Sequence, residues 1–318
     1  MAFLKFITRA LIGLSLVAGA AHAQQPLRLV VPFAAGGGTD QYVRLLASEL
    51  AKKGTPVIVE NKPGASGIVA ADYVARAKPD GLTVLVSSLG TLASNTVLFE
   101  KLPYDPKKDF APVTQIAYQP AIVVGRPDLP YRNIKEMVAH AKANPGKINR
   151  GSPGEAILTN LAPLSFEKTV GISTTHVPFN GDSPAIQGLL SGTIDIDGTS
   201  ITSVLSLVQS GKLRVLGVMD GRRLPQVPDA PTFKEQGFDF EALLWYSLSA
   251  PSGTPNDAVM RLNKAVNEVI ADPAFVTRAR AMGMEPRGST PQELAKFVQT
   301  EHDRWVPVLQ SLNLPKQH

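Results

Sequence analysis

Cysteine is absent from the 318-residue sequence, and histidine occurs only five times. Without cysteine there is no disulfide bond, no thiol nucleophile and no thiolate-bound metal. The motifs G-x-S-x-G and H-E-x-x-H, which mark serine hydrolases and zinc proteases, are also absent, and no histidines show metal-ligand spacing. We therefore expect a protein that is not an enzyme and that carries neither a metal nor a cofactor.

Strong charge of one sign and long apolar runs are also scarce. The formal net charge is +5 and the basic residues are scattered, so neither nucleic acid nor an anionic membrane surface is an expected partner. One largely apolar run, Ala10–Ala18, follows Lys5 and Arg9 and precedes the small-x-small sequence Ala21–Ala23. This order is typical of a secretory signal peptide. We expect cleavage after Ala23, which lowers the formal charge from +5 to +3, and export of a soluble chain.

The remaining chain alternates short apolar runs with amphipathic segments, which indicates an α/β fold. Leu27–Phe33 has the pattern of a strand, and Thr39–Lys52 places Val43, Leu46 and Leu50 on one helical face. Near-continuous Val, Ile and Leu in the strands indicate mostly parallel sheets flanked by helices. Further helices are expected at 68–77, 134–143, 156–168, 184–190, 257–270, 273–282 and 291–309, and further strands at 56–61, 82–90, 149–154, 175–179 and 193–198.

Two long segments interrupt the alternation and indicate two domains. Residues 112–125 hold two apolar runs separated by Tyr118-Gln119-Pro120, as in a strand that serves two sheets, and a second passage follows at 212–220 and 243–251. The strand-end loops of two such sheets face each other across a cleft, where α/β proteins bind ligands. We expect a signal peptide at 1–23, the first part of domain 1 at 24–120, domain 2 at 121–225, and a return to domain 1 with C-terminal helices at 226–318.

A glycine-rich turn, Gly36–Asp40, joins the first strand to the first helix. It is not a phosphate loop, because no Lys-Ser/Thr pair follows, and Gln41 stands where a dinucleotide motif has its last glycine. Glycines let a ligand approach the backbone, and free amides at a helix start attract an anion. The alternative is a tight structural turn in which Thr39 or Asp40 caps the helix.

A second turn, Asn180–Pro184, stands at the equivalent place in the other half and follows the same Val-Pro-Phe sequence. Here too, Asp182 or Ser183 could simply cap a helix. Another pair of strand ends, Ser88–Thr91 and Ser152–Glu155, also occurs once in each half. The recurrence in both halves favours a binding function for these turns.

Three other features leave alternatives open. His176 lies near a loop but is expected to pack within a strand. Asp195 and Asp197 stand two apart, and they form either a metal-binding pair or strand-end caps. Trp245-Tyr246 either lines the cleft or fills a core.

The order and spacing of several motifs resemble the substrate-binding proteins of tripartite tricarboxylate transporters, also called the Bug family. The likeness covers nearly the whole mature chain. It runs through PFAAGGGTD, VENKPGASG, ARAKPDG, KLPYDPKKDFAPVT, AKANPGKINRGSPG, THVPFNG, PDAPTFKEQG, LSAPSGTP and GSTPQEL.

This resemblance implies a two-domain type II periplasmic-binding-protein fold, the Venus flytrap, which closes on a small organic carboxylate such as a di- or tricarboxylate, an aromatic acid or an acidic amino acid. It also implies a periplasmic monomer whose partners are that ligand and the membrane subunits of a transporter. The two turns would hold the carboxylate through backbone amides and waters. The strand ends Ser88–Thr91 and Ser152–Glu155 would contact the variable part of the ligand. The expected ligand-binding residues are Phe33, Ala35, Gly36, Gly37, Gly38, Thr39, Asp40, Ser88, Thr91, Ser152, Gly154, Glu155, Phe179, Asn180, Gly181 and Thr199.

The sequence departs from the family pattern at positions that bear on the ligand. Glu155 stands in a loop of usually small residues and would favour a ligand with an ammonium or hydroxyl group. Arg150, at a commonly aromatic position, either pairs with a second ligand carboxylate or faces solvent. Other departures are Ala35 and Gly38 for prolines, Phe179 for tyrosine, Asn180 for lysine, Gly188 for aspartate and Asn160 for histidine.

Two alternative functions stay open from the sequence. One is a binding protein that presents its ligand to a receptor of a sensing system. The other is an exported hydrolase or transferase that uses the same cleft, although the few histidines and the lack of cysteine argue against it. Turnover of a bound compound would point to the enzyme.

Overall fold

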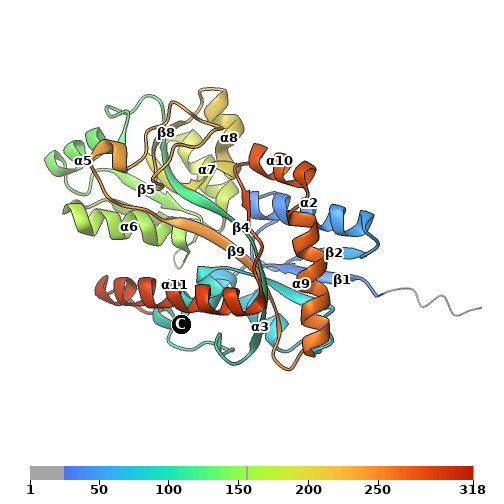
Figure 1. Ribbon diagram of the computed structural model, residues 1–318. Coiled ribbons are helices and arrows are strands. Elements are labelled where there is room, and N and C mark those ends of the chain that lie inside the picture. Colours follow the sequence, from blue (N-terminus) through green and yellow to red (C-terminus); the bar gives the residue numbers. More distant parts are fainter. Residues whose placement is uncertain (1–24, 155–156, 318) are drawn as a thin grey trace, which may run out of the picture.

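The computed structural model describes residues 25–154 and 157–317. Its strands are β1 (Leu27–Val31), β2 (Val57–Asn61), β3 (Thr83–Ser87), β4 (Phe110–Gly125), β5 (Asn149–Ser152), β6 (Thr175–Pro178), β7 (Ile196–Ser200), β8 (Arg214–Val218), β9 (Leu243–Pro251) and β10 (Glu285–Pro286). Its helices are α2 (Gly38–Lys52), α3 (Ile68–Ala75), α4 (Asn95–Leu98), α5 (Ile134–Ala143), α6 (Leu158–Val170), α7 (Asp182–Ser191), α8 (Ile201–Gln209), α9 (Asn256–Ile270), α10 (Pro273–Ala281) and α11 (Pro291–Ser311). Short helical turns are η1 (Ala65–Gly67), η2 (Gly90–Ser94) and η3 (Lys234–Gln236). Two lobes are joined along β4 and β9 (Figure 1).

In the first lobe, β1 lies between β2 and β3 and is parallel to both, while β9 runs antiparallel beside β3. Side chains alternate along β1, so its two faces need separate cover. Leu29 and Val31 pack with residues of α2 and α9, whereas Val30 packs with residues of α3 on the other face. A strand buried on both faces has little use for polar side chains, which explains the apolar run in β1.

The second lobe repeats this plan. β5 lies between β6 and β7 and is parallel to both, and β7 and β8 run antiparallel to the second part of β4. Ile122 and Val124 of β4 pack with residues of α7 and α8, whereas Ala121 and Val123 belong to the core that includes α5 and α6. Each lobe is therefore a sheet covered by helices on both faces.

β4 belongs to both lobes, as the interrupted apolar pattern of residues 112–125 predicts. Its residues 110–120 pair with β9, and its residues 121–125 pair with β7 and β8. A ring of three backbone hydrogen bonds, each 2.9 Å, lies where β4 changes partners. Ala121 N–H donates to Ala242 O, Ala242 N–H to Met219 O, and Met219 N–H to Ala121 O.

The segment after β8 stays against the second lobe. Phe233, Phe238 and Phe240 surround Phe166 of α6, with ring centroids 4.8, 5.1 and 5.5 Å from it. The sequence predicts a return to domain 1 from residue 226, but this packing favours a return after Ala242. We propose on this packing that domain 2 covers residues 121–242.

The last three helices complete the first lobe: α9 and α11 lie against β4, and α10 packs against β10, α2 and α9. α10 begins after Asp272, whose carboxylate accepts two backbone N–H bonds, and α11 begins with a capping box formed by Thr290 and Glu293. No helix among the residues that the structure describes is both long and apolar enough to cross a bilayer.

Candidate functional site

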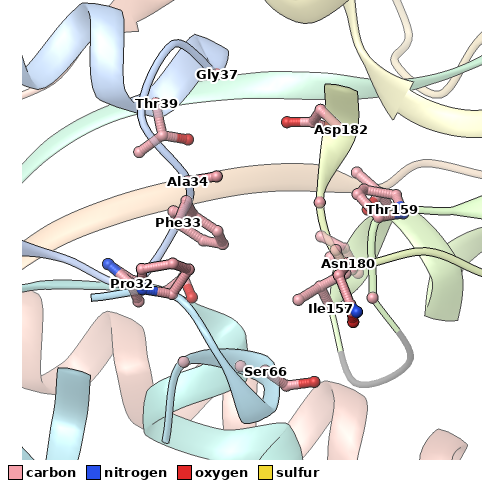
Figure 2. A pocket seen from close by; sticks show the side chains of 18 of the residues that line it. Pro32, Phe33, Ala34, Gly37, Thr39, Ser66, Ile157, Thr159, Asn180 and Asp182 are labelled. Carbon is pink, nitrogen blue, oxygen red and sulfur yellow. The ribbon is translucent and has the colours of Figure 1, made fainter. Parts of the chain in front are cut away.

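A cleft between the two lobes contains a cavity of about 810 Å³. Loops that follow β1, β2 and β3 form one wall, and loops that follow β5 and β6, with the last residue of β7, form the other. Figure 2 shows Phe33, Ala34 and Thr39 facing Thr159 and Asp182 across the open space. The cavity therefore lies at the carboxyl ends of two sets of parallel strands, the usual ligand position in α/β folds.

Five helices begin at this cavity, and none of them has a side-chain cap. Their N-cap residues all belong to the cavity lining: Gly37 for α2, Gly67 for α3, Ile157 for α6, Gly181 for α7 and Ser200 for α8. Away from the cavity, α5, α10 and α11 are capped by the side chains of Asn133, Asp272 and Thr290, whereas α4 and α9 have no side-chain cap. Uncapped helix N-termini present free N–H groups and partial positive charge, so their convergence favours an anion.

The first turn is held from behind by Asp40. Its carboxylate accepts hydrogen bonds from Gly36 N–H (2.8 Å), Arg44 Nε (2.9 Å) and Asn61 Nδ2 (2.8 Å). Burial by itself would raise the pKa of Asp40, but the hydrogen bonds from Arg44, Gly36 and Asn61 hold that pKa below its usual value. Asp40 thus keeps a fixed negative charge that shapes the turn, and Gly36 needs its glycine because φ is +84°.

The second turn is tied to the neighbouring strand end. Phe179 N–H donates to Ser152 O at 2.9 Å, and Gly181 N–H donates to Pro153 O at 3.0 Å. Gly181 has φ of +111°, a conformation that residues with a side chain rarely adopt. The loops after β5 and β6 therefore form one unit in the second lobe.

The structure brings half of the expected ligand-binding residues to the cavity wall. Those in the lining are Phe33, Gly37, Thr39, Ser88, Gly154, Phe179, Asn180 and Gly181. Seven others are outside the lining: Gly38, Asp40, Thr91, Ser152 and Thr199 are buried behind it, and Ala35 and Gly36 are exposed. Thr91 Oγ1, for example, accepts from Ser88 N–H at 3.0 Å and so fixes that loop. Glu155, with the ligand preference assigned to it, lies outside the described residues.

Sequence reasoning missed three parts of the wall. The η1 loop contributes Ala65 and Ser66, whose φ values of +44° and +50° are unusual for residues with a side chain. Thr159 at the start of α6 and Asp182 at the start of α7 also line the cavity. The KPGASG motif that contains η1 is visible in the sequence, but only the fold shows that it meets the glycine turns.

Trp245 and Tyr246 of β9 fill a core and line the cavity at once. Trp245 is nearly fully buried, and its Nε1–H donates to Glu301 Oε2 at 2.9 Å. The ring of Tyr246 meets the ring of Phe33 edge-on, with centroids 6.2 Å apart. The two alternatives left open by the sequence are therefore both true in part.

Arg150 neither faces solvent nor points to a ligand carboxylate, so both expectations for it are wrong. Only 1% of the side chain is exposed. Its guanidinium pairs with Glu167 Oε1 at 2.7 Å and donates to Asn160 Oδ1 at 2.7 Å. Glu167 lies on α6, so the charge of Arg150 is neutralised within the second lobe before any ligand arrives.

Asp195 and Asp197 do not act as a pair. Asp195 accepts from Asn149 N–H at 2.8 Å and contacts Arg126 at 3.2 Å. Asp197 is fully buried, and neither carboxyl oxygen has a hydrogen-bond partner among the described residues. Burial and the nearby Asp182 raise the pKa of Asp197 well above its usual value. No group of acidic or histidine side chains in the described ranges is arranged to hold a metal.

His176 lies within β6, as expected, and fixes the neighbouring strand end. Its Nε2 lies 2.8 Å from Ser152 Oγ, and that hydroxyl donates to Gly154 O at 2.9 Å. Ser152 therefore accepts from Nε2–H, so the neutral ring carries its proton on Nε2. Burial, aided by Arg150, lowers the pKa of His176 to about 4.

This shift predicts a loss of stability in acid. Between pH 6.5 and about 4 the unfolded chain binds a proton at His176 and the folded protein does not, so the free energy of unfolding falls as the pH falls through this window. His176→Gln keeps an N–H donor without the titration. Denaturant unfolding at pH 7 and pH 4.5 is expected to show wild type losing on the order of 2 kcal/mol more than the variant. Equal losses would exclude His176 as the cause.

Two α/β lobes that enclose a ligand-sized cleft define a solute-binding protein of the Venus-flytrap class. The model of the tripartite tricarboxylate transporter family receptor matches residues 42–314, so the chain belongs to this family. This match confirms the family that the sequence motifs predicted. The two-domain fold that they implied is confirmed as well. The family and the neighbouring structures are binding proteins rather than enzymes.

Three relatives show how far the likeness extends. The protein BugT of Bordetella pertussis is 32% identical and covers 91% of this chain and 89% of its own. The structure of R. palustris Rpa4515 with adipate has a TM-score of 0.89 at 30% identity, over 93% of this chain and 99% of that one. MatC from Rhodopseudomonas palustris with bound malate has a TM-score of 0.82 at 35% identity, over 89% and 98%.

Proposed function

We propose that this protein captures a small organic carboxylate and delivers it unchanged to the membrane subunits of a tripartite transporter. The observation that carries the proposal is the convergence of five uncapped helix N-termini on one cavity. Backbone N–H groups satisfy an anion with donors that are already in place, so little side-chain order is lost on binding. A membrane subunit can then recognise the loaded protein by its shape.

The size of the cavity supports a ligand of a few carbon atoms with more than one polar end. Its volume of about 810 Å³ lies within the roughly 300–1,000 Å³ of small-molecule sites. Uncapped helices in both lobes offer a place for a carboxylate at each end of such a ligand. The two neighbours were solved with adipate and with malate, and we infer a small carboxylic acid here as well.

The lining residues are the proposed contacts of the ligand. Gly37 and Thr39 from the first turn and Asn180 and Gly181 from the second would hold the carboxylate. Ser88, Gly154, Phe33 and Phe179 would surround the rest of the ligand. The seven expected residues outside the lining would shape these loops without touching the ligand.

Capture in the cleft couples occupancy to shape. A ligand that contacts both lobes stabilises their approach, because only the closed arrangement allows both sets of contacts. We infer a periplasmic monomer, exported by a signal peptide that is cleaved after Ala23, and that peptide lies outside the described residues.

A thermal-shift screen of the mature protein tests this function. At least one acid among mono-, di- and tricarboxylates, aromatic acids and acidic amino acids is expected to stabilise the fold, by about 2.7 kcal/mol at a hundredfold excess over Kd. The neutral amides of the same acids are the matched controls and are expected to have no effect. A flat response to every acid would contradict the proposal. Recovery of a chemically altered compound would identify an enzyme instead.

A further inference from the structure

Asp182 is the only charged residue among the described residues that line the cavity. It is the first residue of α7, and its side chain points across the cleft toward Thr39 and Gly37 (Figure 2). Thr199 Oγ1 lies 3.4 Å from its Oδ1, and a Cβ added at Gly37 would lie 3.5 Å from its Oδ2. The carboxyl therefore reaches from the second lobe to the opposite wall.

Asp182 has no cationic partner among the residues described. Two buried acids near the site have cationic partners, Asp40 with Arg44 at 2.9 Å and Glu167 with Arg150 at 2.7 Å, whereas the buried Asp197 forms no ion pair within the described residues. Burial raises the pKa of Asp182, while hydrogen bonds from Ser203 and Thr199 act in the opposite direction and stabilise the charged form. Removing an ionised carboxylate from water costs free energy unless a cation lies beside it.

Thr159 supplies a second polar atom on the same wall. Only 5% of this residue is exposed, and its Oγ1 has no hydrogen-bond partner within the described parts of the chain. Thr159 lines the cavity beside Asp182 (Figure 2). A buried hydroxyl without a partner indicates that a ligand or water completes its hydrogen bonding.

We propose that Asp182 selects ligands that carry an ammonium group beside the carboxylate, so that the protein binds an amino acid rather than a plain dicarboxylate. This inference rests on the proposed carboxylate-binding function. The ammonium group would lie against Asp182 with Thr159 as a neighbouring acceptor, and the carboxylate would lie on the uncapped helix N-termini. A second ligand carboxylate at Asp182 would meet like charge, whereas an ammonium group supplies the missing partner.

Matched pairs of acids that differ only in the α-amino group test the inference. Calorimetry would compare glycine with acetate, alanine with propionate, aspartate with succinate, glutamate with glutarate, and phenylalanine with phenylpropionate. The amino member of the best-bound pair is expected to bind at least about tenfold more tightly, the strength of one charge-assisted hydrogen bond. Asp182→Asn keeps the shape and removes the charge, and it is expected to abolish this preference. Asp128→Asn, at an exposed acid outside the cavity, is the matched control and should keep it.

The results of these experiments distinguish a failure of the role of Asp182 from a failure of the proposed carboxylate binding. Equal or tighter binding of the plain acid by wild type would overturn the role of Asp182 and leave carboxylate capture standing. The same holds if Asp182→Asn keeps the full preference for the amino member. Failure of both members of every pair, together with a flat carboxylate screen, would overturn the proposed function itself.

Discussion

Gly181→Val is expected to abolish ligand binding, with affinity at least a hundredfold weaker, while the protein stays folded. At φ of +111° a β-branched residue is strongly disfavoured, so the turn must rearrange and the N–H groups at the start of α7 leave the cavity. The new side chain would also point toward Ala34 on the opposite wall, whose Cβ is 3.9 Å from the added Cβ. Two lost hydrogen bonds to a charged group, about 1.5–3 kcal/mol each, account for the loss. Calorimetry with an acid found in the screen measures it.

Gly54→Val is the control for backbone strain. Gly54 has φ of +88°, no atom lies within 4 Å of an added Cβ, and the residue is not part of the cavity lining. Both variants are expected to lose about 1–3 kcal/mol of unfolding free energy, and only Gly181→Val should lose binding. Normal affinity in Gly181→Val would show that the second turn does not hold the ligand. Gly36, which is exposed and outside the cavity lining, is a less direct test of contact than Gly181.

Gly38→Ala is expected to weaken binding at least about tenfold by keeping the two lobes apart. Gly38 opens α2 in the first lobe, and a Cβ there would lie 2.7 Å from both Cβ and Cγ2 of Thr202 on α8 in the second lobe. Carbon atoms in contact lie about 3.5–4.0 Å apart, so the helices must separate by about 1 Å. The ligand contacts of the first lobe are then displaced relative to those of the second lobe. Calorimetry measures the affinity, and small-angle scattering measures the separation.

Thr202→Gly provides the decisive comparison, because it removes both atoms that the new methyl group would meet. The double variant Gly38→Ala/Thr202→Gly is expected to bind as Thr202→Gly alone does. Alanine is a better helix former than glycine, so a loss of α2 stability is not the cause. A double variant that stays as weak as Gly38→Ala would show that the contact between lobes does not control binding.

The fold was largely predictable because its signals are local. Helix α5 and strand β9 have the predicted limits, 134–143 and 243–251, since apolar periodicity marks both. Strand β7 begins three residues later than expected, and α8 was missed. α8 follows β7 directly, with Ser200 as both last strand residue and N-cap, so no turn residue separates the two patterns.

The site was predictable only in part, because its chemistry depends on contacts between distant segments. The paired glycine turns were visible, and the structure brings both to one cavity. Asp182 looked like a helix cap, because nothing nearby in the sequence shows that its carboxyl faces Gly37. Arg150 looked available for a ligand because its partner Glu167 is on a different element. Contacts between different lobes or between different elements depend on tertiary packing, and local sequence patterns do not predict them.

The ring of backbone hydrogen bonds at Ala121, Met219 and Ala242 limits how the two lobes can move relative to each other. Both passages of the chain between the lobes run through this one place, so a sliding movement would break the ring while a rotation preserves it. We infer that the lobes rotate beside this ring, so that different ligands close the cleft by the same kind of movement. Recognition by a partner can then be general while ligand choice is specific. Substitutions at this ring should leave capture intact and uncouple it from delivery.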